Sequence, residues 1–586
     1  MAKIRTIQNS YASGAIDDKI LGRTDTDILS KGALELENVY VSPQGGALRR
    51  EGLKYVDNTA GNAVARMVGF EFNVEQTYIL VFTAGSFKVY KTDVVGSVQA
   101  TVVSSPISGL TANIIKEMRW TQSADTLYLV HPDIQPIKIT RTSDTAWTAA
   151  NVSFSNIPDY NFGSGGEAVI SSARGWPRSI AFWRGRLWLG GLKSRPQTIL
   201  SSKVGLFEDL DEGTSLDDEG INITIDDDSV NAITDVFPGR GFQIFTTGGE
   251  FTLRSSLDDP ITPSNAFTLL QKETLHGSGP GANATAGTSW CRPKSVDGAT
   301  IFVEAEGGVV RQFVFNDLEQ SFGATNISIL SQNIVTDPVS MDIRRAVATH
   351  PNDYLYVVNS DGTVCVLNSL RDQSLLAWSK FTTQGSFEDV AVSGRKAFFI
   401  VKRVIDDATV RFIEVLDDDH YTDASIRTVS ASETTSWSGL DHLDGEALKV
   451  RGDGYIFNPA TPASGAITSS EPATILEAGL NFSAKVRHVP IDIVIQGQPF
   501  SGQYKSPVFA NIRLYQSRNI VVTYEGKRQV PSFRNFGDSV LDEAVSNFSG
   551  WKKVYMGGVR RDVEVTITQD EPLEFNVLAV SFGVRV

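Results

Sequence analysis

A two-strand pattern that recurs seven times constrains the fold of this chain more than any other feature. Each copy consists of an alternating apolar run, a turn that contains Gly, Asp or Asn, and a second alternating run, which is typical of a β-hairpin. The copies begin about 40–60 residues apart, the spacing of the blades of a β-propeller or a similar radial repeat. One hairpin cannot bury its apolar face alone, whereas a ring of hairpins shares a core. The copies span residues 78–90, 126–139, 186–201, 242–253, 299–310, 354–367 and 397–416.

The sequence on either side of this repeat has a different character, so we predict three regions. Residues 1–60 are rich in turn-forming glycine and are expected to form an arm or platform segment that packs on something else. Residues 61–420 are predicted to form the propeller, and residues 421–586 a separate β-sandwich or barrel-like domain. Candidate helices are few and short, for example residues 31–39. The predicted fold is therefore all-β: a β-propeller of about seven hairpin-based blades with additional β-rich platform or tip domains.

Length and composition indicate a folded protein with more than one core. At 586 residues the chain is longer than a single hydrophobic core usually supports. Its content of 41% hydrophobic and 21% charged residues is ordinary for a folded soluble protein. No apolar run approaches the roughly 18 residues that cross a bilayer, and the first ten residues lack the apolar core of a signal peptide. We therefore expect synthesis in a cytoplasm and no stable membrane insertion.

The net charge of −15 argues against sequence-specific or tight DNA binding, because phosphate contacts require clusters of Lys and Arg. An acidic wall is compatible with DNA that passes without binding. The two cysteines, Cys291 and Cys365, each stand alone in their segments. They form neither a disulfide framework nor a zinc pattern, and we expect them to be small buried residues in strands.

The densest charge lies in an acidic segment at residues 208–228. Clustered carboxylates suit hard cations, but the spacing does not fit an EF-hand: counted from Asp209, the sixth position is Thr214 and the twelfth is Gly220. Two interpretations stay open, a solvated acidic loop or a structural cation held at 226–228 with ligands from elsewhere. The same two interpretations apply to residues 417–420.

The sequence shows no catalytic constellation, so we expect a protein without enzymatic activity or cofactor. None of the six histidines lies at a metal-ligand spacing from another. The Gly-x-Ser-x-Gly elbow and the Gly-Lys-Ser/Thr phosphate loop are both absent. Ser360-Asp-Gly-Thr363 lacks the spacing and the Trp of the sialidase turn. Arg451-Gly-Asp453 is explained by a hairpin turn, and Arg184-Gly-Arg186 by surface pairing with the abundant acids.

Short blocks spread over almost the whole chain point to a known family. The first are Leu21-Gly-Arg-Thr-Asp25, Asn38, Gly45-Gly-Ala-Leu-Arg-Arg50 and Gly52-Leu-Lys-Tyr55. The later ones include Arg66-Met-Val-Gly-Phe-Glu-Phe72, Arg119-Trp-Thr-Gln122, Gly175-Trp-Pro177, Gly185-Arg-Leu-Trp188, Pro238-Gly-Arg240, Thr247-Gly-Gly-Glu250, Ala377-Trp-Ser379, His442-Leu-Asp-Gly-Glu446 and Gln569-Asp-Glu-Pro-Leu-Glu-Phe575. In this order the blocks resemble the nozzle proteins of short-tailed bacteriophages, also called tail tubular protein B. One departure is Gly69, where the family's Arg-x-x-Pro-Phe block has proline.

This resemblance implies a structural virion protein of the distal tail tube. Six copies would form a ring below the tail adaptor protein, each with a β-propeller and β-rich platform and tip regions. The ring would carry tail fibres or spikes and conduct double-stranded DNA into the host during ejection, without binding it specifically. The resemblance places the protein in the virion tail, after assembly in the host bacterial cytoplasm.

Two groups of residues are candidate contacts in such a ring. The acidic segment is the candidate for a channel or ring contact, through Asp217, Asp218, Glu219, Asp226, Asp227 and Asp228. The basic pair Arg49 and Arg50 is the candidate for a contact with a neighbouring subunit or the adaptor.

Two other functions stay open. A propeller-type glycan hydrolase acting on a host surface polymer would need clustered carboxylates at one end of the propeller. A partner-binding hub of the WD type would carry Gly-His and Trp-Asp repeats, which are absent. The Gly-rich segment 1–60 favours a ring subunit, which can use such a segment to contact a neighbour.

Overall fold

The computed structural model of the chain describes residues 3–23, 26–92, 98–163, 165–228, 230–254, 261–279, 290–346, 351–370, 373, 375–491, 494–495, 498–499, 502–534, 537 and 545–585. Within these residues the chain is built from strands, one short α-helix, α1 (Ala112–Glu117), and short 3₁₀ turns such as η1 (Asp18–Ile20), η2 (Leu29–Lys31), η3 (Ala60–Asn62) and η5 (Asp441–Leu443). None of the described helices is long and apolar enough to cross a membrane.

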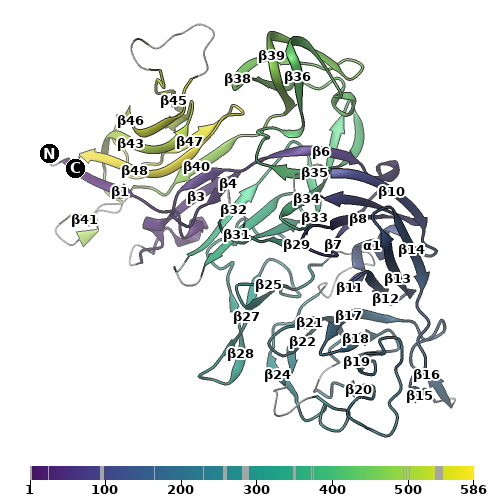
Figure 1. Cartoon of the computed structure of the whole chain (residues 1–586). Helices are drawn as coiled ribbons and strands as arrows, with labels where there is room; N and C mark the ends of the chain where they lie inside the picture. The colour runs from purple at the N-terminus through teal and green to yellow at the C-terminus, as the bar shows by residue number, and fades with distance from the viewer. Residues whose placement is uncertain are drawn as a thin grey trace.

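Five four-stranded antiparallel sheets follow one another along the chain as the first blades of a β-propeller (Figure 1). Their strands are β7 (Arg66–Glu71), β8 (Thr77–Thr83), β9 (Ser86–Thr92) and β10 (Val98–Pro106); β11 (Arg119–Ser123), β12 (Thr126–His131), β13 (Ile134–Ser143) and β14 (Ala146–Asn151); β17 (Pro177–Trp183), β18 (Arg186–Leu192), β19 (Arg195–Ser201) and β20 (Ile221–Thr224); β21 (Ile233–Pro238), β22 (Phe242–Thr246), β23 (Glu250–Leu253) and β24 (Leu270–Thr274); and β25 (Lys294–Val296), β26 (Ala299–Val303), β27 (Val310–Asn316) and β28 (Ser321–Asn326). A small hairpin, β15 (Asp159–Asn161) with β16 (Gly166–Ala168), separates the second blade from the third.

The sixth and seventh blades continue into sheets formed by the two ends of the chain. The sixth contains β29 (Pro338–Arg344), β30 (Tyr354–Asn359), β31 (Val364–Leu370) and β32 (Leu375–Phe381). The seventh contains β33 (Ser386–Ser393), β34 (Lys396–Ile405) and β35 (Ala408–Asp417), and its fourth strand is β6 (Gly52–Asn58) from the N-terminal region. The strand from the start of the chain thus completes the last blade.

The ring closes where the inner strand β7 of the first blade meets β33 of the seventh. The amide of Met67 donates a 2.6 Å hydrogen bond to the Asp389 carboxylate. Gly69 lies within β7, and a Cβ atom there would be 2.3 Å from the carbonyl oxygen of Val392. The departure from the family pattern at Gly69 therefore lies in a strand at a close approach between two blades, not in a turn.

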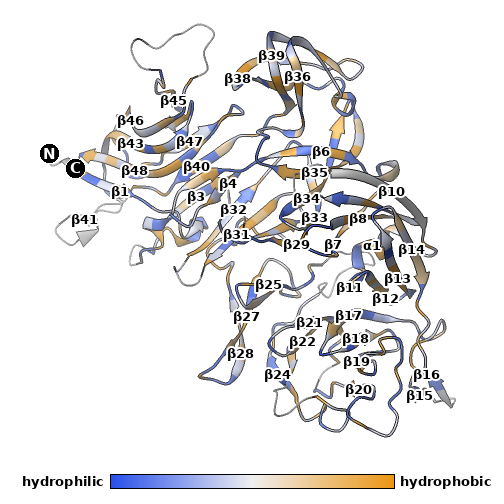
Figure 2. Ribbon diagram, viewed as in Figure 1, coloured by the Kyte–Doolittle hydropathy of each residue, from blue (hydrophilic) through white to orange (hydrophobic). Residues whose placement is uncertain are grey.

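These sheets confirm the predicted all-β propeller. Each of the seven sequence copies falls on the two central strands of one blade, from β8 and β9 to β34 and β35, and the fifth copy ends at the first residue of β27. The copies were detectable because these strands are buried between neighbouring blades and their apolar side chains recur at the blade spacing. Figure 2 shows the hydrophobic residues gathered along these strands.

The two ends of the chain interleave in the remaining sheets. A six-stranded sheet combines β1 (Lys3–Gln8), β4 (Val39–Val41) and β5 (Ala47–Arg49) with β43 (Ser506–Ser517), β46 (Phe548–Tyr555) and β48 (Asn576–Arg585). The sheet of the sixth blade continues into β2 (Gly14–Ala15), β3 (Gly32–Glu37), β40 (Ala484–His488), β47 (Thr566–Gln569), β44 (Val521–Tyr524) and β45 (Lys527–Gln529). The sheet of the seventh blade continues into β36 (Asp423–Ser438), β39 (Ala466–Leu480), β37 (Leu448–Gly452) and β38 (Tyr455–Ala460), and a short pair, β41 (Val494–Ile495) with β42 (Gln498–Pro499), lies apart.

This arrangement corrects the predicted boundaries. Residues 1–60 are not one separate arm, because 52–58 belongs to the seventh blade and the strands before it pair with the C-terminal region. Residues 421–586 likewise divide into a part that extends the seventh blade and a part that shares sheets with the N-terminus. The predicted helix at 31–39 is wrong: residues 32–37 form β3, which pairs with β40. Tertiary pairing overrides the helical preference of this short stretch.

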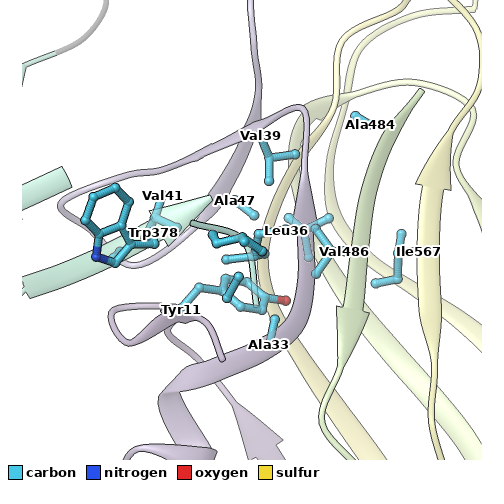
Figure 3. Close-up of a cluster of buried hydrophobic side chains, with 14 of the residues drawn as sticks. Tyr11, Ala33, Leu36, Val39, Val41, Ala47, Trp378, Ala484, Val486 and Ile567 are labelled. Atoms are coloured by element: carbon cyan, nitrogen blue, oxygen red, sulfur yellow. The ribbon is translucent and has the colours of Figure 1, made fainter. Parts of the chain in front are cut away.

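One large hydrophobic core joins these parts. Figure 3 shows side chains of one buried cluster that come from the N-terminal region (Tyr11, Leu36, Val39), the sixth blade (Trp378) and the C-terminal region (Val486, Ile567). We call the parts of these sheets that are formed by the two ends of the chain the terminal sheets. They are packed on the propeller through a common apolar core.

Candidate functional site: the buried junction between propeller and terminal sheets

The end of β5 and the short segment that links it to β6 carry the arginine pair singled out in the sequence. Arg50 is 2% exposed, and its guanidinium donates two hydrogen bonds, of 2.9 and 2.7 Å, to the carboxylate of Asp423. It also donates to Asn38 Oδ1 and to the carbonyl of Thr382, and it lies 3.6 Å above the ring of Phe482. One side chain thus connects the sixth and seventh blades, β36 and the C-terminal region.

Arg49, the last residue of β5, lies 4.2 Å from the centre of the same Phe482 ring. It donates to four backbone carbonyls, those of Tyr421, Phe482, Gln569 and Glu571, at 3.0–3.3 Å. Burial lowers the pKa of Arg49 to about 9, and the adjacent positive charge of Arg50 acts in the same direction. The guanidinium nevertheless donates to carbonyls from three separate chain segments.

These contacts correct the interpretation of Arg49 and Arg50 as residues that touch a neighbouring subunit or the adaptor. Both side chains are buried, at 6% and 2% exposed, and they donate hydrogen bonds to groups of their own chain. An arginine pair beside a glycine turn looks like a surface feature in a sequence, and only the fold reveals the carbonyls and the aspartate around it.

A second buried ion pair extends this network into the seventh blade. Arg403 pairs with Glu414 at 2.7 Å, with both side chains fully buried. Thr383 connects the two pairs, because its hydroxyl donates to Asp423 and accepts from Arg403. Burial raises the pKa of Glu414, and the attraction of Arg403 opposes this shift.

A separate set of charged residues lies on the inner strands that surround the propeller axis. Arg119, on the inner strand of the second blade, donates to both oxygens of Asp235 on that of the fourth, at 2.5 and 3.1 Å. Trp290 donates to the same carboxylate at 3.1 Å, and its ring lies 4.3 Å from the Arg119 guanidinium. Asp389 accepts from Ser340 in the same region, where burial raises the pKa of its carboxyl group. The Asp235 carboxylate thus links the second blade to the fourth, and the Asp389 carboxylate links the sixth blade to the seventh.

Sequence reasoning did not single out this axial network. Its signal is a charged residue at the first position of an inner strand, as with Arg66 in β7 and Arg119 in β11. Both positions also begin blocks of the family resemblance, so their recurrence could have indicated an axial role.

The acidic segment does not form one cluster. Asp217 and Asp218 are exposed, whereas Glu219 is 7% exposed and its carboxylate accepts hydrogen bonds from the amides of Thr214 and Leu216 at 2.7 Å. The Glu219 side chain therefore stabilises its own loop, which corrects its assignment as a contact residue.

The second half of the segment, residues 226–228, follows β20, whereas residues 217–219 precede that strand. Asp226 and Asp228 are exposed, while Asp227 pairs with Lys272 at 2.5 Å and accepts from Asn231. The attraction of Lys272 lowers the pKa of Asp227. Within the described residues, three or more His, Cys, Asp or Glu side chains nowhere gather as a metal ion would require.

A pocket of about 530 Å³ lies in the terminal region, beside β1. Its lining includes the apolar side chains of Ile7, Leu29 and Phe582 and the acidic side chains of Asp562 and Glu564. Glu564 is engaged by Arg487 at 2.7 Å. The pocket is thus bounded by residues from both ends of the chain.

No protein-family model and no curated protein sequence matches this chain. Among solved structures the chain is similar to the RRP9 WD40 repeats, with 8% identity, coverage of 63% of this chain and 99% of that one, and a TM-score of 0.36. It is also similar to U3-55K, at 9% identity, 63% and 100% coverage and a TM-score of 0.34, and to BBS1N in complex with ARL6DN, at 11%, 63% and 98%, and 0.33. Scores of this size carry no argument about function.

Proposed function

We propose that this chain is a structural subunit of the tail nozzle of a short-tailed bacteriophage. In this role it forms a ring, of six copies by the family resemblance, that docks to the tail adaptor and carries fibres or spikes. The ring conducts double-stranded DNA during ejection without binding it specifically. No catalytic step or cofactor is part of this role.

The observation that carries the proposal is that blocks of the resemblance, far apart in the sequence, contact one another in the fold. Arg49 of an early block donates to the carbonyls of Gln569 and Glu571 in the last block. Tyr55 stacks on His442 with ring centroids 3.8 Å apart, which joins two further blocks. Short matches that arise by chance have no reason to meet in space, whereas residues that build a shared architecture do.

The buried junction suits the mechanical demands of this role. A tube wall must keep its domains in fixed orientation while DNA moves past it. The fully buried pair Arg50–Asp423 restricts sliding at the junction between the propeller and the terminal sheets, because any shift would leave a charge buried without its partner. The pair Arg403–Glu414 stiffens the adjoining seventh blade, since it joins β34 to β35. The net charge of −15 supports passage of DNA without retention.

Electron microscopy of the purified chain, alone and after mixing with tail-less particles of its phage, tests the proposal. We expect rings with an axial channel at the portal vertex of the particles, whether or not rings form in free solution. An unrelated propeller protein of similar size serves as the control for non-specific adsorption. A folded chain that never joins the particle would overturn the proposal, and cleavage of a host surface glycan by that chain would replace it with the hydrolase alternative.

A further inference from the structure

One face of the six-stranded terminal sheet combines aromatic and basic side chains. The register places Arg5 of β1, Phe509 of β43 and Tyr555 of β46 in one row across the sheet, with Gly583 of β48 between the first two. The parallel rows contain Ile7 with Lys553, and Arg513 with Trp551. We call these residues the aromatic–basic face: Arg5, Ile7, Phe509, Arg513, Trp551, Lys553 and Tyr555.

This face is open, while the opposite face of the same strands is buried. Ile7, Trp551 and Tyr555 are 55%, 43% and 65% exposed, whereas the alternating residues Ile512 and Phe582 belong to the core. The cations lie over the rings: Lys553 is 4.6 Å from the centre of Phe509 and 4.7 Å from that of Tyr555. Such contacts hold the positive charges in place against an apolar surface.

The charge of these strands is opposite to that of the chain. The sequences of β1, β43, β46 and β48 contain six Lys or Arg residues and no Asp or Glu, in a protein whose net charge is −15. A partner that covers this face therefore needs acidic groups for the cations and apolar groups for the rings.

The loop between β19 and β20 has this complementary character. Val204, Leu206 and Leu216 are 48%, 58% and 60% exposed, and Asp217 and Asp218 are exposed beside them. The amide of Val204 donates to the Asp218 carbonyl at 2.9 Å, and this hydrogen bond holds the beginning and the end of the loop side by side. We call these five residues the acidic–apolar loop.

We propose that the aromatic–basic face of one copy binds the acidic–apolar loop of a neighbouring copy. Figure 1 places the sheet of β1 and β48 and the loop beside β20 at opposite ends of the molecule, so one copy cannot join them within itself. The contact is therefore heterologous, and repeated head-to-tail contacts of this kind close into a ring when the rotation permits. The inference rests on the proposed function, in which the chain acts as a ring subunit.

A second copy fits this face better than DNA does. A phosphate backbone would pair with the cations but would leave Ile7, Trp551 and Tyr555 without an apolar partner. The loop supplies Leu206 and Leu216 for these groups together with its carboxylates. Exposed Trp, Tyr and Arg are also the residues most enriched at the centres of protein interfaces.

A charge-swap experiment tests the pairing directly. One variant carries Arg513→Glu with Lys553→Glu, and the other carries Asp217→Lys with Asp218→Lys. Each alone places like charges across the contact, so we expect self-association at least about tenfold weaker than in the wild type. An equimolar mixture restores opposite charges at every contact in an alternating ring, so we expect assembly to return. Lys402→Glu with Arg427→Glu, two exposed residues outside the face, is the matched control.

Association is measured by mass photometry in solution and by electron microscopy on tail-less particles, after thermal unfolding shows that each variant is folded. Assembly of the mixture but of neither variant alone would support the proposal. Variants that assemble like the control, or a folded mixture that fails where the wild type assembles, would overturn it while leaving the nozzle role intact. A wild-type chain that never joins the particles would instead remove the proposed function on which the inference rests.

Discussion

The propeller and the terminal sheets of this protein are assembled by different means. Each of the first five blades comes from one continuous stretch of chain, and its strands pair with their neighbours in sequence. The terminal sheets pair β1 with β48 and β3 with β40, which lie at opposite ends of the chain. The blades are thus specified by a repeated apolar pattern, whereas the terminal sheets depend on pairings between distant segments and on buried polar residues at their junction with the propeller, such as Arg50 and Asp423.

Breaking the Arg50–Asp423 pair tests this difference with the largest expected effect. Arg50→Met removes one partner and leaves the Asp423 carboxylate buried without its cation. We expect the free energy of unfolding to fall by about 3–5 kcal/mol. Urea denaturation should also separate into two transitions, because the terminal sheets lose a link to a propeller whose own contacts are unchanged.

Arg240→Met provides the matched control. Arg240 pairs with Asp317 at 3.2 Å, but their side chains are 64% and 75% exposed. We expect a loss of no more than about 1 kcal/mol there, since solvent screens an exposed pair. Equal losses in the two variants would show that the junction does not depend on its buried pair.

The same difference explains how much of the fold the sequence predicts. The seven hairpins were visible because alternation and turns are local signals, and Asp453-Gly454 was correctly assigned to a turn, with both φ angles positive. The role of residues 52–58 in the seventh blade was not visible, because the partner strand β35 lies some 350 residues later in the chain. Arg49 and Arg50 were singled out by a family motif, yet their burial depends on partners that no local pattern reveals.

Protonation of a buried histidine in the terminal region should have an intermediate effect on the free energy of unfolding. His488 is fully buried, accepts a hydrogen bond from the Tyr11 hydroxyl at 2.9 Å, and donates to the Val565 carbonyl at 3.2 Å. Burial lowers the pKa of His488 to about 4, from 6.5. As pH falls from 6.5 to 4 the unfolded chain binds a proton that the folded chain rejects, so this group's contribution to stability is present above 6.5 and is lost toward 4.

We expect this loss to reach about 3 kcal/mol and to disappear in His488→Gln. Urea denaturation at pH 7.5, 5.5 and 4 measures the difference in unfolding free energy between wild type and variant, in which the other titrating groups cancel. The difference should shrink as pH falls. His276→Gln, on the propeller and partly exposed, controls for removal of an imidazole. A difference that stays constant with pH would contradict the assignment.

The smallest expected effect concerns the seam that closes the propeller. In Gly69→Ala the added Cβ would lie 2.3 Å from the Val392 carbonyl oxygen, closer than such atoms approach, so the first and seventh blades must separate slightly. We expect a loss of about 1–3 kcal/mol and faster hydrogen exchange confined to β7 and β33. Gly323→Ala, in β28 with no atom within 4 Å of the added Cβ, should be neutral or slightly stabilising. Unchanged exchange in β33 would show that the ring tolerates a wider seam, and that the closure depends on β6 and the Asp389 contact instead.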